Sequence, residues 1–287
     1  MLVLRMLKVN HYIKNFVCAV PLLFSKNFVH IDLLLNTIYI IIAFCFISSC
    51  VYIINDLIDI KKDRIHPVKC NRPIASGKIS IPVAVLTFIV LLILSLFISF
   101  KVNSFCCLFV LLYLVLNILY SFFLKNIIIV DIACIALGFI FRILAGCAAI
   151  FVLPSPLVIL LTFFLSMFFT CTKRKLELQV MNNDSAARQS LKEIDLNTIN
   201  QFILINAILA ISFYFTYVLD AETIKKAGTP YLYITVIPFT LIVYRLFLLI
   251  NTTKIADDPI IYLEKDKIIK WLFAFYFLTF GILLLVK

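Results

Sequence analysis

An asparagine and three aspartates follow directly on a long apolar stretch that ends at Ile54. They are Asn55, Asp56, Asp59 and Asp63. At about 100° per residue, a helix would bring all four side chains within about 100° of one another. Carboxylates this close repel one another unless a cation holds them together, and hard oxygen ligands with phosphate partners suit Mg²⁺. The spacing therefore predicts a magnesium site, although a solvated, charged helix end beside a membrane stays open as the alternative.

The loop after the acidic run is rich in positive side chains and turn-forming residues: Arg64, His66, Pro67, Lys69, Arg72, Pro73 and Gly77. Arginine makes bidentate contacts with phosphate oxygens, and lysine acts as a point charge. Cations interleaved with a carboxylate–metal site are what a bound pyrophosphate requires. Alternatively, some of these cations serve only to keep the loop in the cytoplasm.

A second polar group, Lys173-Arg174-Lys175-Leu176-Glu177, ends a later apolar stretch. The number of membrane crossings between the two groups places it on the same side of the membrane as the acidic run. Lys173 and Glu177 are four residues apart, so on a helix they either pair with each other or bind a ligand.

Two ionisable residues, Asp131 and Arg142, lie inside apolar stretches. A charge within a membrane span is costly, so each is expected to face the bundle interior, to pair, or to line a polar cavity, and each is a site candidate. About three helical turns separate them, which predicts different depths. Tyr120 and Lys125 end the preceding stretch and could line the same cavity, although Tyr120 equally suits an interfacial aromatic belt.

Membrane helices must position these groups. Hydrophobic residues make up 64% of the 287 residues and charged residues 14%, which excludes a water-soluble globular protein and a disordered chain. In lipid, an apolar stretch of about 20 residues must be a helix. Pro154 and Pro156 divide the longest stretch, 126–172, into two helices. The other expected spans cover residues 13–31, 33–55, 79–100, 102–124, 196–219, 227–250 and 271–286, which makes nine in total.

The distribution of charge predicts the orientation. Most of the 26 lysines and arginines fall in loops on one side of this nine-span arrangement, and positive loops stay in the cytoplasm. The N-terminus, the acidic run and the Lys173 group are therefore expected on the cytoplasmic face. The formal charge of +11 favours anionic lipid headgroups or phosphorylated substrates as partners, and no nucleic acid, because no soluble basic domain is present. Eight of the nine cysteines lie in apolar stretches, so neither a disulfide framework nor a zinc site is expected.

These residues resemble the UbiA superfamily of intramembrane prenyltransferases, whose first signature, Asn-Asp-x-x-Asp-x-x-x-Asp, is matched by Asn55, Asp56, Asp59 and Asp63. The closer resemblance is to the branch of decaprenyl-phosphate phosphoribosyltransferases, and it covers nearly the whole chain. The further matching pieces are Tyr12-Ile13-Lys14-Asn15, Asp63-Arg64, His66-Pro67, Lys69, Arg72-Pro73-Ile74-Ala75-Ser76-Gly77, Tyr120-Ser121, Leu124-Lys125, Asp131, Gly138-Phe139, Arg142, Ala145-Gly146, Lys173-Arg174, Glu177-Leu178, Pro238-Phe239, Arg245 and Asp258-Pro259.

Two departures from the family pattern stand out. Prenyltransferases proper carry a second aspartate-rich motif, which Lys173-Arg174-Lys175-Leu176-Glu177 replaces here. A cationic loop suits an additional phosphate better than a second magnesium. In addition, Lys8-Val9 and Tyr12 stand where the family pattern has arginine-proline and tryptophan.

The resemblance implies one domain over residues 1–287, an all-α bundle of nine transmembrane helices with a cytoplasm-facing polar cavity, in the inner membrane of a bacterium. It implies transfer of a 5-phosphoribosyl group from phosphoribosyl pyrophosphate to a polyprenyl phosphate, with Mg²⁺ as cofactor. The implied catalytic residues are Asp56, Asp59, Asp63 and Arg72, and the three aspartates together with Asn55 are the implied metal ligands. The implied substrate-binding residues are Lys14, Asn15, Arg64, Lys69, Tyr120, Lys125, Asp131, Arg142, Lys173, Arg174 and Glu177.

Within that set, Lys173 and Arg174 are assigned to the ribose 5-phosphate, and Lys14, Lys125 and Arg142 to the lipid phosphate. The alternative activity is an ordinary prenyltransferase, in which a prenyl diphosphate occupies the magnesium site and an aromatic or other small acceptor attacks. An anion or lipid transporter is the alternative from another class, although no inverted repeat marks one and the acids gather at a helix end. A homo-oligomer stays open.

Overall fold

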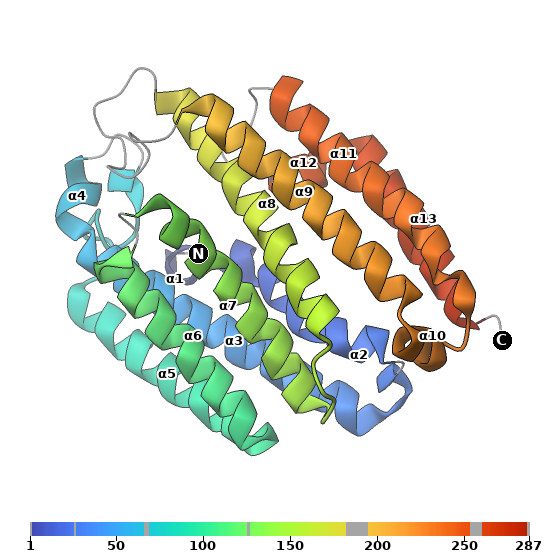
Figure 1. Ribbon diagram of the computed structural model, residues 1–287. Coiled ribbons are helices and arrows are strands. Elements are labelled where there is room, and N and C mark those ends of the chain that lie inside the picture. Colours follow the sequence, from blue (N-terminus) through green and yellow to red (C-terminus); the bar gives the residue numbers. More distant parts are fainter. Residues whose placement is uncertain are drawn as a thin grey trace. The chain divides into compact units, whose positions relative to one another are not determined.

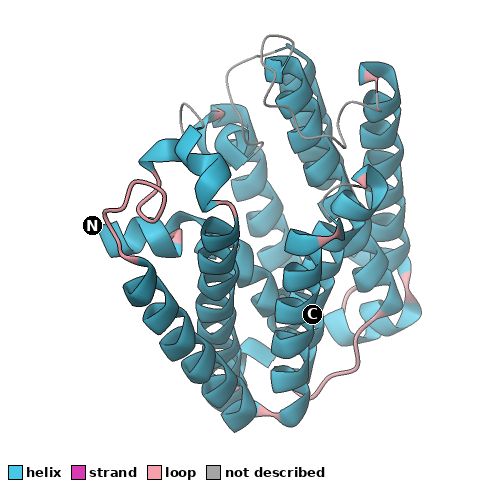
Figure 2. Ribbon diagram, turned by 90° about the vertical axis from the view of Figure 1, so that its left-hand side faces the viewer, coloured by secondary structure: helices cyan, strands magenta, loops and turns pink. Residues whose placement is uncertain are grey.

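The computed structural model describes residues 2–25, 27–65, 69–124, 127–181, 195–252 and 260–285, and within these ranges all regular secondary structure is helical (Figure 2). Eight of the helices are long and apolar enough to cross a membrane. They are α3 (Ile31–Ile58), α5 (Ile81–Val102), α6 (Ser104–Phe122), α7 (Ile128–Ala149), α8 (Pro156–Met181), α9 (Leu196–Leu219), α11 (Val236–Thr252) together with the short helix that precedes it from Pro230, and α13 (Lys267–Leu285). The expected all-α membrane class is therefore confirmed, and the helix break at Pro154 lies where the sequence predicted it.

Short helices connect these long ones (Figure 1). They are α1 (Leu2–Leu7), η1 (Val9–Ala19), α2 (Val20–Phe24), η2 (Asn27–Val29), α4 (Ile60–Ile65), η3 (Lys69–Asn71), α10 (Ala221–Ala227), η6 (Pro230–Thr235) and α12 (Ile260–Lys265), where η denotes a 3-10 helix.

The prediction of a first membrane span over residues 13–31 is wrong. The structure divides this segment among η1, α2 and η2, so the described residues contain eight long helices and not nine. Pro21 lies in the first turn of α2 and lacks the N–H that would continue a helix from the preceding residues. Asn15, fully buried in the middle of η1, makes polar contacts that an unbroken, lipid-facing helix would not need.

The chain forms two compact units. The first comprises residues Met1–Lys125 and Gly138–Pro154, and the second comprises Asn126–Leu137 and Ser155–Lys287. Helix α7 contributes its N-terminal part to the second unit and its C-terminal part to the first. The organisation as one domain over residues 1–287 stays a prediction.

The first unit is built around α3, whose apolar side chains Phe44 and Ile47 are fully buried. Helix α5 packs on α3, and Ser95 Oγ of α5 donates a hydrogen bond to the Ala43 carbonyl oxygen at 2.8 Å. Helix α7 comes very close to η1, because a Cβ added at Gly146 would lie 2.2 Å from the carbonyl oxygen of Cys18. Small and polar residues thus allow close backbone contact where lipid supplies no hydrophobic driving force between helices.

The second unit pairs α8 with α9 and α11 with α13. Its core includes the fully buried Phe168 and the buried Leu246. A buried hydroxyl network joins α9, η6 and α13, because Tyr214 Oη lies 2.6 Å from Thr235 Oγ1 and 2.8 Å from Tyr276 Oη. Such a network satisfies polar groups that would otherwise be costly inside the membrane.

Candidate active site

The acidic run lies where α3 passes into α4. Helix α3 ends at Ile58, Asp59 caps it, and α4 begins at Ile60. Backbone hydrogen bonds continue across this turn, from Asp59 N to Asn55 O at 3.0 Å and from Asp63 N to Asp59 O at 2.8 Å. The helical spacing assumed from the sequence is therefore kept, and Asp56 and Asp63 are both buried.

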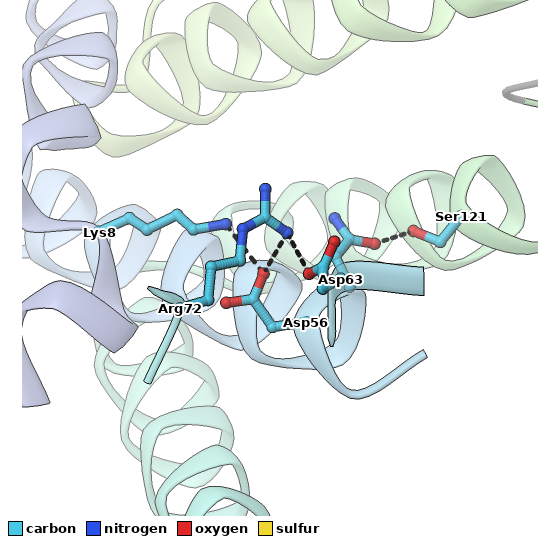
Figure 3. A network of polar contacts seen from close by, with 6 residues as sticks. Lys8, Asp56, Asp63, Arg72 and Ser121 are labelled. Carbon is cyan, nitrogen blue, oxygen red and sulfur yellow. Dashed lines mark hydrogen bonds and ion pairs between the residues drawn. The ribbon is translucent and has the colours of Figure 1, made fainter. Parts of the chain in front are cut away.

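Arg72 joins these two buried carboxylates. Its Nη1 donates to Asp56 Oδ1 at 3.1 Å and to Asp63 Oδ2 at 2.7 Å (Figure 3). The sequence prediction that Asp56 and Asp63 share one side of the helix end, with Arg72 beside them, agrees with this geometry. Asn55, the first residue of the acidic run, uses its Oδ1 to accept a hydrogen bond from Ser121 Oγ of α6.

The loop after α4 folds back and holds Arg72 in place. Arg64 Nε donates to the carbonyl oxygen of Ala75 at 3.2 Å, and Ile79 N donates to the carbonyl oxygen of Pro73 at 2.9 Å. Ile74 and Ile79 are buried in one apolar cluster with Met6 and Ile53. Arg64, expected from the resemblance to bind substrate, therefore braces the loop through its Nε.

Lys8 is a site residue that the sequence reasoning did not assign. Its Nζ lies 3.1 Å from Asp56 Oδ1 and 4.7 Å from the centre of the Tyr52 ring. Burial lowers the pKa of Lys8, and the charge of Asp56 opposes that shift. The contact spans 48 positions in the sequence, so no local spacing could have shown it. The signal in the sequence was that Lys8 stands where the resembling family has an arginine.

The donor set fits a magnesium ion. Asp56 Oδ2 is buried and has no hydrogen-bond partner among the described residues, and an unpaired buried carboxylate oxygen is costly unless something binds it. Within the same part of the chain, no three His, Cys, Asp or Glu side chains converge as a ready-made metal cage. Magnesium is usually bound by one or two carboxylates together with water and substrate phosphates. Asp56 and Asp63 meet that requirement, and the partly buried Asp59 lies one turn from each of them.

Arg142 forms a second polar centre within the first unit. Its Nε donates to Asn15 Oδ1 at 2.8 Å, its Nη1 to the carbonyl oxygen of Gly138 at 2.9 Å, and its Nη2 to Tyr113 Oη at 3.1 Å. The guanidinium also lies 4.6 Å from the centre of the Tyr113 ring. Arg142 and Asn15, both predicted as site residues, are therefore in direct contact, and the described residues supply no carboxylate to Arg142.

Arg174 forms the centre of the second unit's polar group. Its Nε and Nη2 donate to the two carboxylate oxygens of Asp131, at 2.6 and 2.9 Å, and its Nη1 donates to Glu177 Oε2 at 2.6 Å. Asp131 is fully buried and the Arg174 side chain is 3% exposed. Three predicted site residues thus meet, but they meet as an ion-paired triad, so the structure commits much of the Arg174 guanidinium to carboxylates of its own chain.

The remaining predicted site residues lie in the following places. Lys14 in η1, Tyr120 in α6 and Lys173 in α8 are partly buried, and Lys69 in η3 is exposed. Lys125 lies outside the described residues, as do His66, Pro67, Asp258 and Pro259 from the resembling pieces.

Comparisons with known proteins agree with these features. The sequence profile of the UbiA prenyltransferase family matches residues 16–274. A decaprenyl-phosphate phosphoribosyltransferase of Mycolicibacterium smegmatis is 29% identical over 247 residues, which cover 84% of this chain and 77% of that protein. A protein of the same name from Mycobacterium tuberculosis is 25% identical over 284 residues, which cover 97% of this chain and 93% of that protein.

Among solved structures, a UbiA homolog from Archaeoglobus fulgidus bound to GPP and Mg²⁺ aligns with a TM-score of 0.73 at 19% identity, over 100% of both chains. At this level of identity the likeness shows the fold alone. The expected fold type is thereby confirmed.

Proposed function

This chain belongs to the UbiA prenyltransferase family, and we propose that it transfers a 5-phosphoribosyl group from phosphoribosyl pyrophosphate to a polyprenyl phosphate, with release of pyrophosphate. It is an integral membrane protein and a transferase of the UbiA superfamily. The relatives named as decaprenyl-phosphate phosphoribosyltransferases support this choice of substrates. So does the replacement of the family's second acidic motif by the cationic group that begins at Lys173.

The observation that carries the proposal is the arrangement at Asp56. One carboxylate oxygen contacts Arg72 and Lys8, and the other is buried without a partner among the described residues. Carboxylate oxygens for a metal and cations for a phosphate thus lie side by side. This is the pairing that a magnesium diphosphate requires.

Asp56 and Asp63, with Asp59 and Asn55, would hold Mg²⁺. When bound, the ion would neutralise part of the negative charge on the pyrophosphate. Arg72 is positioned to share that charge as the bond between ribose C1 and the pyrophosphate oxygen breaks and its electron pair leaves with the pyrophosphate. An oxygen of the lipid phosphate then forms the new bond to C1. That oxygen is already anionic, so no strong base is needed, and the protein contributes chiefly charge stabilisation and positioning.

The other assignments follow the contacts of each residue. Arg142 engages Asn15, Tyr113 and the Gly138 carbonyl group, and we assign it to fixing η1, with Lys14 and Lys125 left for the lipid phosphate. Lys173 keeps its assignment to the ribose 5-phosphate. We assign Arg174 to positioning the end of α8 through its carboxylate partners.

The excess of cations in the expected cytoplasmic loops supports a cytoplasmic active site, with the N-terminus on the same side, in a bacterial inner membrane. Polyprenyl phosphate and the lipid bilayer are then the partners on the membrane side, and phosphoribosyl pyrophosphate arrives from the cytoplasm. The same loops would attract its negative charge.

A radiolabel assay on the purified chain in detergent with Mg²⁺ tests the proposal. One reaction contains phosphoribosyl pyrophosphate and a polyprenyl phosphate, and the other contains a prenyl diphosphate and an aromatic acceptor. We expect lipid-linked product only from the first pair. Product from the second pair alone would replace the proposal with the prenyltransferase activity, and binding without Mg²⁺-dependent turnover would favour a transporter.

The same assay tests the acidic cluster. Replacing Asp63 by Asn removes one carboxylate from the contact with Arg72 and should lower the turnover rate by about 100-fold or more, which is typical when charge stabilisation at a reacting centre is lost. Asp32→Asn is the matched control, because Asp32 is an exposed acid in the first turn of α3, whereas Asp63 lies in α4 after the other end of α3; this control should retain wild-type turnover. Equal activity of the two variants would contradict the assignment of Asp63.

A further inference from the structure

The two carboxylate oxygens of Asp56 have different surroundings. Oδ1 is 3.1 Å from both Lys8 Nζ and Arg72 Nη1, whereas Oδ2 is buried with no hydrogen-bond partner among the described residues. We propose that this division is functional: Oδ1 holds Lys8 in place as a second cation that contacts the pyrophosphate, and Oδ2 is kept open for the metal. This inference rests on one part of the proposed function, namely that a diphosphate binds beside Asp56.

The donors of Lys8 support a direct phosphate contact. A lysine ammonium has three N–H donors, and in the described residues Lys8 Nζ makes one hydrogen bond, to Asp56. The Lys8 side chain is 22% exposed, and its ammonium group lies beside Asp56, the carboxylate proposed to bind the metal. In Arg72, Nη1 makes both ion-pair contacts, and Figure 3 shows another nitrogen of the guanidinium pointing away from the carboxylates.

The backbone at Lys8 is held in an unusual conformation. Lys8 has φ 51° and ψ 48°, which is the left-handed region that residues other than glycine rarely adopt. Such a conformation costs energy and persists where surrounding contacts impose it, often at functional sites. Here Met6 is fully buried on one side, Ser49 Oγ donates to the Leu7 carbonyl oxygen at 3.0 Å, and His11 N donates to the Lys8 carbonyl oxygen at 2.9 Å.

The ammonium group of Lys8 is held as well as its backbone. Tyr52 lies on α3, one helical turn before Asp56, and the centre of its ring is 4.7 Å from Lys8 Nζ, so the ring contributes a cation–π attraction. The N-terminal segment thus reaches the end of α3 with its charge already oriented. A preorganised cation spends little energy on reorganisation when the diphosphate arrives.

The charge balance separates the two roles. Removing the Lys8 charge leaves Asp56 with one cation fewer, which favours Mg²⁺ and disfavours a phosphate. A residue with a merely structural role would weaken both ligands together. The affinities for Mg²⁺ alone and for pyrophosphate are therefore expected to change differently in a Lys8 variant.

Isothermal titration calorimetry on the full chain in detergent tests this, with Mg²⁺ alone and with inorganic pyrophosphate at saturating Mg²⁺. For Lys8→Met we expect unchanged or tighter binding of Mg²⁺ and about 10- to 100-fold weaker binding of pyrophosphate, the range that corresponds to one charge-assisted hydrogen bond. Lys8→Arg should restore binding of pyrophosphate to near the wild-type level. Arg5→Met removes an exposed cation from the same segment and should change neither affinity.

Two results would overturn the inference. The first is a pyrophosphate affinity of Lys8→Met within about twofold of wild type, and the second is a parallel loss of Mg²⁺ and pyrophosphate binding. If Lys8→Met does not fold, Lys8→Gly decides, because glycine accepts the left-handed backbone and lacks the ammonium. Pyrophosphate is common to the phosphoribosyl and prenyl reactions, so the substrate-pair assay can fail while this titration succeeds, and the reverse.

Discussion

Replacing Asp131 by Asn should destabilise the protein strongly, because it breaks a buried ion pair and leaves a charge behind. Asp131 is fully buried, the Arg174 side chain is 3% exposed, and two hydrogen bonds of 2.6 and 2.9 Å join them. Breaking one partner of a buried pair costs about 3–5 kcal/mol. The Asn retains one oxygen acceptor and Glu177 still contacts Arg174, so we expect a loss near the lower limit, about 3 kcal/mol.

Thermal unfolding of the purified chain in detergent measures this loss. At about 2–4 °C per kcal/mol for a chain of roughly this size, the midpoint should fall by about 6–12 °C. The matched control is Glu222→Gln, which breaks the pair between Lys226 and Glu222. Their side chains are 63% and 82% exposed, and such surface pairs contribute about 0–1 kcal/mol.

A double variant separates the loss of the pair from the burial of a lone charge. Asp131→Leu combined with Arg174→Met removes both charges, and apolar replacements of a buried pair are often neutral or stabilising. It should therefore recover most of the midpoint lost in Asp131→Asn. A midpoint for Asp131→Asn within about 2 °C of the Glu222→Gln control would refute the reasoning, since it would mean that the pair contributes no more than one at the surface.

Two further predictions concern packing and pH. Gly146→Ala places a Cβ at 2.2 Å from the Cys18 carbonyl oxygen and should lower the free energy of unfolding by about 1–3 kcal/mol. The control is Gly281→Ala, whose added Cβ has nothing within 4 Å and should not lower the melting midpoint. Equal midpoints for the two variants would contradict the close contact between α7 and η1. The hydrogen bond from Arg245 lowers the pKa of Asp266 below its usual value. The ionised Asp266 therefore stabilises the fold above about pH 4, and this stabilisation is lost as the pH falls through the lowered pKa. Melting curves of Asp266→Asn should show less acid destabilisation than wild type between about pH 5 and pH 3, and identical pH profiles would count against the pair.

The sequence predicted the long helices well because an apolar stretch of about 20 residues in lipid must form a helix. The apolar stretch 196–219 became α9 with the same bounds, and the prolines at 154 and 156 separated α7 from α8. The rule failed for residues 13–31. That segment is apolar enough to suggest a span, but Pro21 and the buried polar side chain of Asn15 favour short helices instead.

For the candidate site, the sequence determined what depends on neighbours along the chain, and the tertiary structure determined the rest. Helical spacing alone predicts that Asp56 and Asp63 point the same way, because the period of a helix is fixed by its backbone hydrogen bonds. The contacts of Lys8 with Asp56, Ser121 with Asn55 and Arg174 with Asp131 join residues 48, 66 and 43 positions apart. Such pairings follow from how the helices pack against one another. Packing depends on the shapes of all the side chains between the helices, and the spacing of residues along one segment does not determine it.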